Sequence, residues 1–397
     1  MINKSKRAAR FVFIVIACIV FLNACSDKEP KTIVMEDSVQ SDSSAETQNP
    51  ENGKVYQYNS FNIIDNEPVD EQLFGWVDGN NAADLVYKEK SDETTIQSVN
   101  YKYHFTKEIM PVTEDIATYS LSPDGRSLAY VRKNDTLQYV VRDISTGRDT
   151  QLFEWNRDFS ISGVGIGWSG NSSYLTYSIY DYKAGTCIVT VFDLIHGESR
   201  QFTLELDPAS NGIIESDVLS AAVSDDGARL LITSDNLLGY ENTKSLVFIY
   251  DIKANEFIPA KRFYDFKKAY PDFFSANQVM FVDTSSYALC LYDIDREETA
   301  VIGNNIIYYK LSDDGKNIAY VKLSENKEFN IYTAALEGET LGNETRIYQG
   351  ILPTDIWWSP DKSKILMRGS FMHIYHTAGP APQLENSASE TIIIELQ

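Results

Sequence analysis

Short apolar segments alternate with polar turns along most of the chain from about residue 55 onward. The clearest example is the turn Ser122-Pro123-Asp124-Gly125, which precedes the apolar run Ser127-Leu128-Ala129-Tyr130-Val131. Proline sets φ at the second turn position, the aspartate caps the turn through its carboxylate, and glycine accepts a positive φ at the exit. Aromatic and β-branched residues favour strands. The pattern therefore predicts a tight β-hairpin.

The same hairpin pattern recurs along the chain. With Ser122 as the reference position, equivalent positions fall at residues 77, 122, 169, 224, 275, 312 and 359. The first and last are six steps apart, so the mean step is 47 residues. Blade repeats of β-propellers have periods of about 40–50 residues. The Asp-Asp-Gly versions at Asp225-Asp226 and Asp313-Asp314 are interpreted as turns, because they lack the alternating oxygen ligands of a calcium-binding loop.

The second half of each unit contains a further strand. An apolar run that ends in Asp-Ile or Asp-Leu is followed by a polar turn, as in Tyr139–Ile144, Val189–Leu194, Val247–Ile252 and Ala288–Ile294. Four strands make one antiparallel blade, and closing the ring leaves no long exposed sheet edge. We therefore predict an all-β fold, a β-propeller of four-stranded antiparallel blades. Seven blades match the repeat positions, with six or eight as alternatives.

The two ends of the ring are less regular than the repeats between them. In the last unit, Phe371–Tyr375 is expected to form the third strand and Thr391–Leu396 the fourth. The segment Val55–Asn59 precedes the first repeat. It is either a strand that pairs with the last blade and latches the ring, or a separate edge strand.

The phrase Ser-Pro-Asp-Gly-x-x-Leu-Ala-Tyr at residues 122–130 resembles the repeat of TolB-like, WD40-like β-propellers. A similar repeat occurs in the non-catalytic propeller of prolyl oligopeptidase-like peptidases. The resemblance covers most of residues 70–397 and implies the fold strongly but the function only weakly. TolB-like proteins are envelope proteins that act through protein–protein contact. The α/β domain that precedes the propeller in TolB itself has no counterpart in the organisation expected for this chain.

Residues 1–24 are expected to be an export signal. Basic residues between Lys4 and Arg10 precede the apolar run Phe11–Leu22, whose twelve residues are too few to span a bilayer, which needs ~20. The next residues, Leu22-Asn23-Ala24-Cys25, resemble the lipobox of bacterial lipoproteins. The resemblance implies cleavage before Cys25, lipidation of its thiol (for example with palmitate), and a position on the extracytoplasmic side of the cell membrane.

The remaining chain divides into residues 25–54, expected to be the lipidated cysteine and a disordered acidic, serine-rich tether, and residues 55–397, the propeller. The formal net charge is −22, and losing a signal with four basic residues and no acid lowers it to −26. Such a surface repels nucleic acid and anionic lipid headgroups, so neither is expected as a direct ligand. We interpret the acidic shell as solubilising, with an acidic docking surface as the alternative, and expect a monomer.

The chain contains few candidates for catalysis. Cys187 and Cys290 lie in apolar runs and are expected to be buried thiols rather than a disulfide. His373 and His376 fall in a strand pattern that places their imidazoles on opposite faces, which disfavours a shared metal. Gly167-Trp168-Ser169-Gly170 superficially suggests a nucleophile elbow but occupies the turn position of the repeat. We predict no metal site, no cofactor and no enzymatic activity.

The longer loops should lie on the face of the ring opposite the Ser-Pro-Asp-Gly turns, and loops on a rigid scaffold concentrate binding groups. Their aromatic residues are the candidate binding residues: Tyr180, Tyr182, Tyr240, Phe263 and Tyr264. We therefore predict a non-enzymatic, lipid-anchored binding module for an envelope protein or glycan. The alternatives are a polysaccharide-acting hydrolase or lyase with carboxylates at the channel, and a sensory input module of a membrane signalling system.

Overall fold

The structure is a computed structural model that describes residues 53–58, 61–64, 67–89, 91–156, 161–181, 186–205, 217–236, 247–258, 271–283, 285–324, 328–375 and 383–396. The chain divides into two units, Met1–Thr47 and Gln48–Gln397, and the described residues all belong to the second. Within these residues, no helix is long and apolar enough to cross a bilayer.

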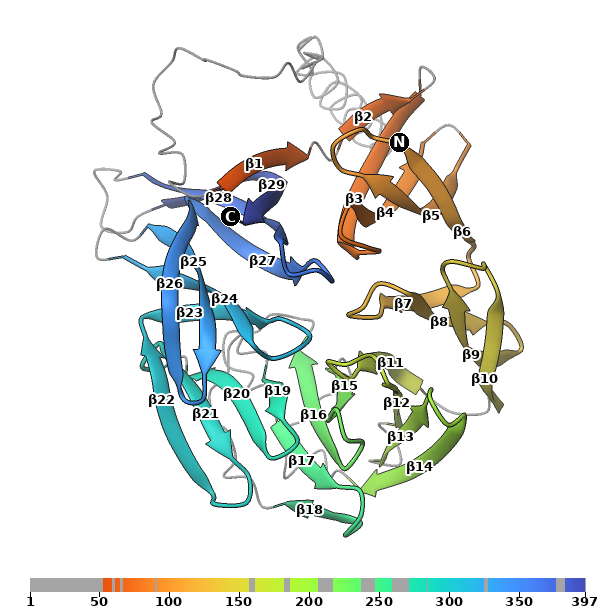
Figure 1. The fold of residues 1–397 in the computed structure, drawn as a ribbon. Helices are drawn as coiled ribbons and strands as arrows, with labels where there is room; N and C mark the ends of the chain where they lie inside the picture. Colours follow the sequence, from red (N-terminus) through yellow and green to blue (C-terminus); the bar gives the residue numbers. More distant parts are fainter. Residues whose placement is uncertain are drawn as a thin grey trace, which may run out of the picture. The chain divides into compact units, whose positions relative to one another are not determined.

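The described strands form seven antiparallel sheets arranged as a seven-bladed β-propeller (Figure 1). Blade 1 contains β2 (Phe61–Ile64), β3 (Glu67–Trp76), β4 (Asn81–Lys88), β5 (Glu93–Asn100) and β6 (Thr106–Val112). Blade 2 contains β7 (Ile116–Leu121), β8 (Ser127–Lys133), β9 (Thr136–Asp143) and β10 (Asp149–Asn156). Blade 3 contains β11 (Ile161–Trp168), β12 (Tyr174–Asp181), β13 (Thr186–Asp193) and β14 (Glu198–Glu205).

Blade 4 contains β15 (Asp217–Val223), β16 (Arg229–Asn236), β17 (Val247–Asp251) and β18 (Glu256–Ile258). Blade 5 contains β19 (Asp272–Ser275), β20 (Gln278–Asp283), β21 (Ala288–Asp293) and β22 (Glu298–Asn304). Blade 6 contains β23 (Ile306–Leu311), β24 (Asn317–Leu323), β25 (Phe329–Glu337) and β26 (Thr340–Gln349). Blade 7 combines β27 (Ile351–Trp358), β28 (Lys364–Tyr375) and β29 (Gln383–Leu396) with β1 (Gly53–Tyr58). The predicted fold class and the seven-blade reading are confirmed.

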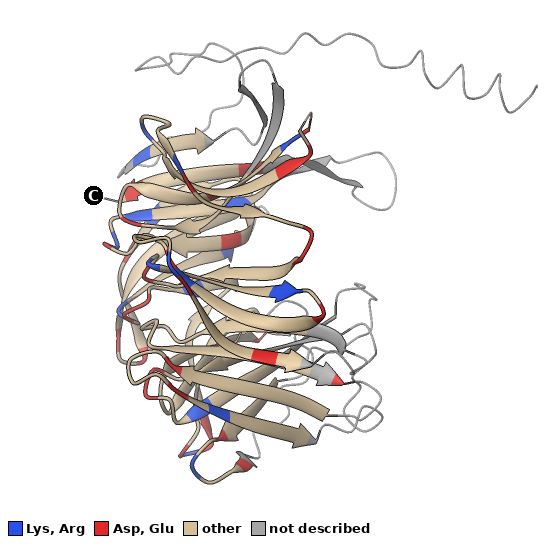
Figure 2. Ribbon diagram, turned by 90° about the vertical axis from the view of Figure 1, so that its right-hand side faces the viewer, with Lys and Arg blue, Asp and Glu red and all other residues tan. Residues whose placement is uncertain are grey.

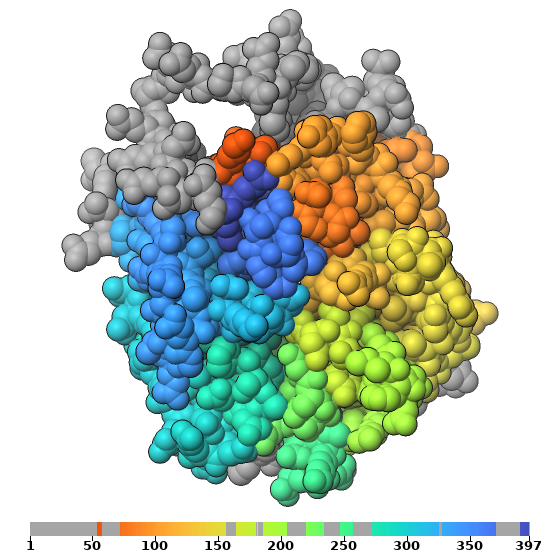
Figure 3. All heavy atoms as spheres, in the orientation of Figure 1, coloured from red at the N-terminus to blue at the C-terminus, as the bar shows by residue number. Residues whose placement is uncertain are grey.

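The ring closes through the first strand of the described chain. β1 pairs antiparallel with β29, from Gly53 opposite Leu396 to Tyr58 opposite Thr391. Figure 3 shows this contact as the red first strand lying against the dark blue C-terminal residues. Of the two readings of this segment, the latch is therefore correct. It supplies blade 7 with its outer strand.

The strand assignment predicted for the last unit is wrong. Phe371–Tyr375 is not a third strand but the continuation of β28, because β28 and β29 stay paired from Lys364 opposite Glu395 to Tyr375 opposite Gln383. Thr391–Leu396 consequently belongs to the third strand, β29, rather than to a fourth. One long hairpin replaces two short strands, and this leaves the outer position of blade 7 for β1.

The core lies between the blades, where their apolar faces meet. One cluster runs from Leu231 of blade 4 through Met280 of blade 5 to Tyr320 of blade 6. The thiols of Cys187 and Cys290 are both free and buried, as predicted. Many of the acidic and basic residues lie at strand ends and in turns (Figure 2). The interfaces between the blades are therefore apolar.

The repeated turn has the predicted hydrogen bonds. In blade 2 the Ser122 hydroxyl donates to Asp124 Oδ1 (2.6 Å), and that oxygen also accepts the Arg126 N–H (3.1 Å). The backbone N–H of Gly125 donates to the Ser122 carbonyl (2.9 Å), and Gly125 has φ +73°. Neighbouring turns are also linked, since the Asp124 N–H donates to Ser172 Oγ of blade 3 (3.1 Å). The turn of blade 2 is therefore held by its own hydrogen bonds and by one to the turn of blade 3.

Candidate functional site

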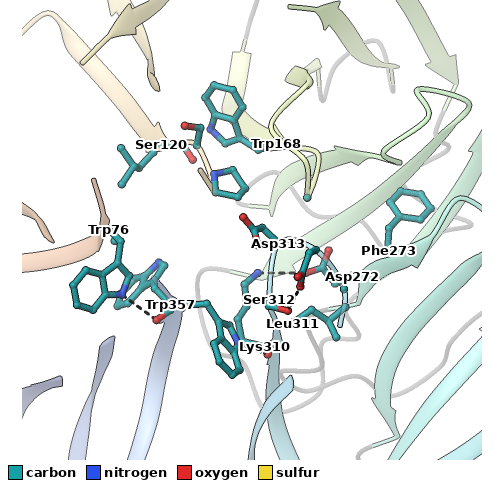
Figure 4. A pocket seen from close by; sticks show the side chains of 18 of the residues that line it. Trp76, Ser120, Trp168, Asp272, Phe273, Lys310, Leu311, Ser312, Asp313 and Trp357 are labelled. Carbon is teal, nitrogen blue, oxygen red and sulfur yellow. Dashed lines mark hydrogen bonds and ion pairs between the residues drawn. The ribbon is translucent and has the colours of Figure 1, made fainter. Parts of the chain in front are cut away.

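A cavity of about 480 Å³ opens where the inner strands end in the repeated turns (Figure 4). It is bordered by the innermost strand of each blade or by the turn that follows it: β3, β7, β11, β15, β19, β23 and β27. Its lining includes Trp76, Ser120, Trp168, Asp225, Asp272, Phe273, Lys310, Asp313, Asp314, Trp357 and Trp358. Because all seven blades contribute, the cavity is a product of ring closure.

Four of the chain's five tryptophans line this cavity. Trp76 and Trp358 are buried, and each indole bridges two blades. Trp76 Nε1 donates to the Trp357 carbonyl (3.2 Å) and Trp358 Nε1 donates to the Lys310 carbonyl (3.1 Å). Trp168 and Trp357 are only half-buried. The first pair therefore builds the wall, and the second pair offers aromatic surface to the cavity.

Carboxylates outnumber cations in the described lining. Lys310 Nζ lies 3.3 Å from Asp272 Oδ2, and Figure 4 shows its side chain reaching toward the middle of the cavity. Lys362, from the blade 7 turn, pairs with Asp313 Oδ1. Asp314 is held inside its own turn. Although burial opposes it, hydrogen bonds from the Ser312 hydroxyl and the Lys316 N–H lower the pKa of Asp314.

The pKa of Asp225 is shifted in the opposite direction, upward. Burial, together with repulsion from Asp272 and Asp226, raises its pKa, and the hydrogen bond from the Asn171 N–H to its Oδ1 (2.8 Å) offsets this only in part. Among the described residues, no Lys, Arg or His forms an ion pair with Asp225. Asp225 is therefore a partly desolvated carboxylate without a described countercharge.

The repeat explains why these carboxylates meet. Asp225 and Asp313 occupy the position that Pro123 holds in blade 2, and all three line the cavity. Asp226 takes the capping role of Asp124, accepting the Ser224 hydroxyl at 2.7 Å. Both Asp-Asp-Gly segments are turns, as predicted. The sequence reasoning stopped there and missed that the first aspartate of each faces the channel.

The positions of three tryptophans in the repeats could have predicted that they lie together, but this was not recognised from the sequence. Trp76, Trp168 and Trp358 each stand directly before the reference position of their repeat. Equivalent positions of a propeller repeat occupy equivalent places around one axis, so the three had to converge. Ser169, beside Trp168, is buried and its hydroxyl hydrogen-bonds Asn171 (2.7 Å). The Gly-Trp-Ser-Gly segment is thus a turn, as expected, and not a nucleophile elbow.

The binding residues predicted on the opposite face remain predictions. The backbone of Tyr180 lies in β12, paired with Cys187, but its side chain lies outside the description. Tyr182, Tyr240, Phe263 and Tyr264 lie outside the described residues, as does the lipidation candidate Cys25. The cavity instead lies at the turn end of the inner strands. The candidate site in the described structure is therefore formed by the repeated turns and not by the long loops.

The described part of the chain contains no group of three or more His, Cys, Asp or Glu that could hold a metal ion. His373 lies in β28 with its side chain outside the description, and His376 lies outside the described residues. Of the ionisable groups in the cavity, Lys310, Asp272 and Asp313 are engaged in ion pairs. The arrangement is suited to holding a ligand by ring faces and charge.

No protein-family model matches this chain, and no curated protein sequence matches it. Several solved structures are similar to this chain. An oligogalacturonate lyase in complex with manganese is 10% identical, with a TM-score of 0.53 over 88% of this chain and 98% of its own. A prolyl endopeptidase is 11% identical, with a TM-score of 0.50 over 83% of this chain and 50% of its own.

TolB from Acinetobacter baumannii is 14% identical, with a TM-score of 0.37 over 70% of this chain and 82% of its own. At these identities the likenesses show the fold alone. The chain is therefore a β-propeller protein of seven blades. Its function must be argued from the cavity.

Proposed function

We propose that this protein is a non-enzymatic binding propeller of the bacterial cell envelope that takes part of an envelope protein or glycan into the channel cavity. The observation that carries the proposal is the convergence of four of the five tryptophans on one cavity. Aromatic side chains supply large contact area at low cost in conformational entropy. The cavity volume, about 480 Å³, falls in the range of roughly 300–1,000 Å³ typical of ligand sites.

The rigidity of the turns supports a binding role. The Ser–Asp hydrogen bonds and the links between adjacent turns hold the rim, so little ordering is required when a ligand enters. Trp168 and Trp357 keep part of their ring surface exposed in this fixed frame. A preorganised, half-exposed aromatic pair is suited to recognition.

The first described strand begins at the turn end of the ring. Gly53 pairs with Leu396, whose N–H donates to the Ser363 carbonyl (2.8 Å) in the blade 7 turn. The chain therefore enters the ring at its turn end, where the cavity also lies. We propose that Cys25 carries the lipid and that the tether leads to this end. A Cys25→Ala variant should leave the membrane fraction, and a variant that stays membrane-bound would contradict the anchor.

Site-specific photo-crosslinking tests the binding function. A benzophenone amino acid replaces Trp357 in the cavity or, as the control, the exposed Val301 on β22. Irradiation of cells should yield an adduct at position 357 and not at 301. The partner so identified should then bind the purified protein at least tenfold more weakly when Trp168 is changed to Ala. Trp155→Ala, on the outer strand β10, is the matched control. Equal labelling at both positions would refute the proposal.

An enzyme acting on polysaccharide is the second candidate, favoured by one observation. Asp225, with its raised pKa, lies near enough to Asp272 for charge repulsion. A pair of carboxyl groups can divide the roles of general acid and general base. Incubation with envelope or plant polysaccharides should then release oligosaccharides, and Asp225→Asn should abolish the release. Stable complex formation without any product supports the binding role instead.

A further inference from the structure

We propose that the channel cavity binds an organic cation, an ammonium or guanidinium group, through Asp225 and the ring faces of Trp168 and Trp357. The group would belong to a lysine or arginine side chain of a partner or to a free polyamine, which share this chemistry. The inference rests on the proposed function, because it names the ligand chemistry of the same cavity. It arises from carboxylate charge and aromatic surface in one confined space.

Charge is the first argument. The described lining has four carboxylates, from Asp225, Asp272, Asp313 and Asp314, and one ammonium, from Lys310. Lys310 forms an ion pair with Asp272, and Lys362 forms one with Asp313. An anionic ligand would meet this excess negative charge. A cation is attracted both by the cavity and by the field of a chain with net charge −22.

Asp225 is the second argument. One of its oxygens accepts the Asn171 N–H, and its carbonyl accepts Asn171 Nδ2 (3.0 Å), which fixes the side chain at the rim between blades 3 and 4. Burial beside Asp272 and Asp226 raises its pKa. An entering cation would supply the countercharge that the described surroundings lack. A neutral sugar could stack on the tryptophans but would leave this carboxylate uncompensated.

The aromatic faces are the third argument. Cations lying over indole rings within about 6 Å of the centroid gain electrostatic energy, more so when desolvated. Trp357 already takes part in one such contact, because the Arg368 guanidinium, which is not part of the cavity lining, lies 5.8 Å from the centroid of its ring. Lys310 shows that an ammonium group is accommodated in the same space. Trp168 has no cation assigned to it among the described interactions.

The test uses the mature full chain, with calorimetry and intrinsic tryptophan fluorescence. The probes are N-acetyl-arginine amide, its neutral isostere N-acetyl-citrulline amide, N-acetyl-lysine amide and spermidine. The arginine and lysine probes should bind at least tenfold more tightly than citrulline, and binding should weaken with salt. Preference for spermidine over the amino acid amides would assign a free polyamine, and the reverse a peptide side chain.

Variants locate the site. Asp225→Asn should weaken binding of the arginine probe at least tenfold, whereas Glu154→Gln, which removes the same charge on the outer strand β10, should not. Lys310→Gln should strengthen binding severalfold, because it removes the ion-pair partner of Asp272. A gain of affinity in this variant would still test the proposal if Asp225→Asn folds poorly. Trp168→Phe should weaken binding, with Trp155→Phe as its matched control.

Binding should also decline as the pH falls, because the neutral carboxyl of Asp225 attracts cations weakly. The charged groups facing it are Asp272 on β19, Asp226 in its own turn, and Asp313 and Lys310 from blade 6. Equal affinity for arginine and citrulline, or an unchanged Asp225→Asn variant, overturns the inference. If the neutral citrulline probe still changes the intrinsic tryptophan fluorescence, the proposed binding function is retained. If no probe does and position 357 gives no adduct, both are refuted.

Discussion

Glu395 joins the two ends of the ring, and replacing it should weaken closure. Its Oε1 accepts hydrogen bonds from the Tyr101 hydroxyl and from Lys102 Nζ (2.7 Å), and its Oε2 accepts the Tyr56 hydroxyl (3.3 Å). Glu395 lies on β29, Tyr56 on β1, and the other two follow β5 of blade 1. One carboxylate thus holds the last blade, the latch strand and the first blade together.

The magnitude follows from the exposure of each partner. The Lys102 and Glu395 side chains are 37% and 21% exposed, so this ion pair contributes only about 0.5 kcal/mol. Tyr101 is buried, and its bond to a charged acceptor contributes about 1.5 kcal/mol. We therefore expect Glu395→Gln to lower the free energy of unfolding by about 2 kcal/mol. Glu395→Ala should cost about 1 kcal/mol more, because it leaves the buried hydroxyl unsatisfied.

The pH dependence has a definite sign. Burial would raise the pKa of Glu395, but hydrogen bonds from Lys102 and Tyr101 outweigh it and lower the pKa below the ordinary 4.5. A carboxyl whose pKa is lowered by folding stabilises the protein above the ordinary value and loses that contribution as the pH falls through the folded value. The difference between the wild type and Glu395→Gln should therefore shrink in acid.

Urea denaturation at pH 7 and in acid measures both effects, with the exposed Glu154→Gln as the control. A double-mutant cycle with Tyr101→Phe should give a coupling free energy of about 1 kcal/mol. A loss below about 0.5 kcal/mol at pH 7, or a difference that does not change with pH, would refute the role of Glu395 in ring closure.

Three further predictions concern the turns, the cavity and the core. Gly125→Ala should destabilise by at least about 2 kcal/mol more than Gly197→Ala in urea denaturation. Both glycines have positive φ, but a Cβ at Gly125 would collide with the Trp76 carbonyl oxygen, whereas nothing lies within 4 Å at Gly197. Asp225→Asn should raise the melting temperature at pH 7, because a carboxyl whose pKa is raised by folding destabilises once ionised. The gain should vanish in acid. Burial raises the pKa of Cys187 to about 12, so its thiol should react with a disulfide reagent at pH 8 only after unfolding.

Much of the fold was predictable because its information is local. Each repeat turn is specified by adjacent residues, as Ser122 and Asp124 show by bonding each other two positions apart. The spacing of these turns predicted seven blades. The last blade was predicted wrongly, because Phe371–Tyr375 looks like a separate strand when its partner is unknown. Its pairing with β29 extends β28 instead.

The candidate site was harder to predict than the fold. The first residues of the Asp-Asp-Gly turns were recognised as turn residues, but the direction of Asp225 and Asp313 depends on blades that lie across the channel. Gly170 of blade 3 illustrates this, since a Cβ there would lie 3.3 Å from both Asp225 Oδ1 and the Asp313 carbonyl oxygen. Such convergence is set by the curvature of the ring.

The sequence by itself determined the hairpins, their period and the all-β class, because turn chemistry and alternation act over a few residues. Only the tertiary structure decided which strand closes the ring and what lines its centre. Tyr56 and Glu395 are 339 residues apart in the sequence. The residues of β1 alone therefore do not predict that β1 pairs with β29. The tryptophans meet for the same reason, because closure brings equivalent positions of separate repeats around one axis.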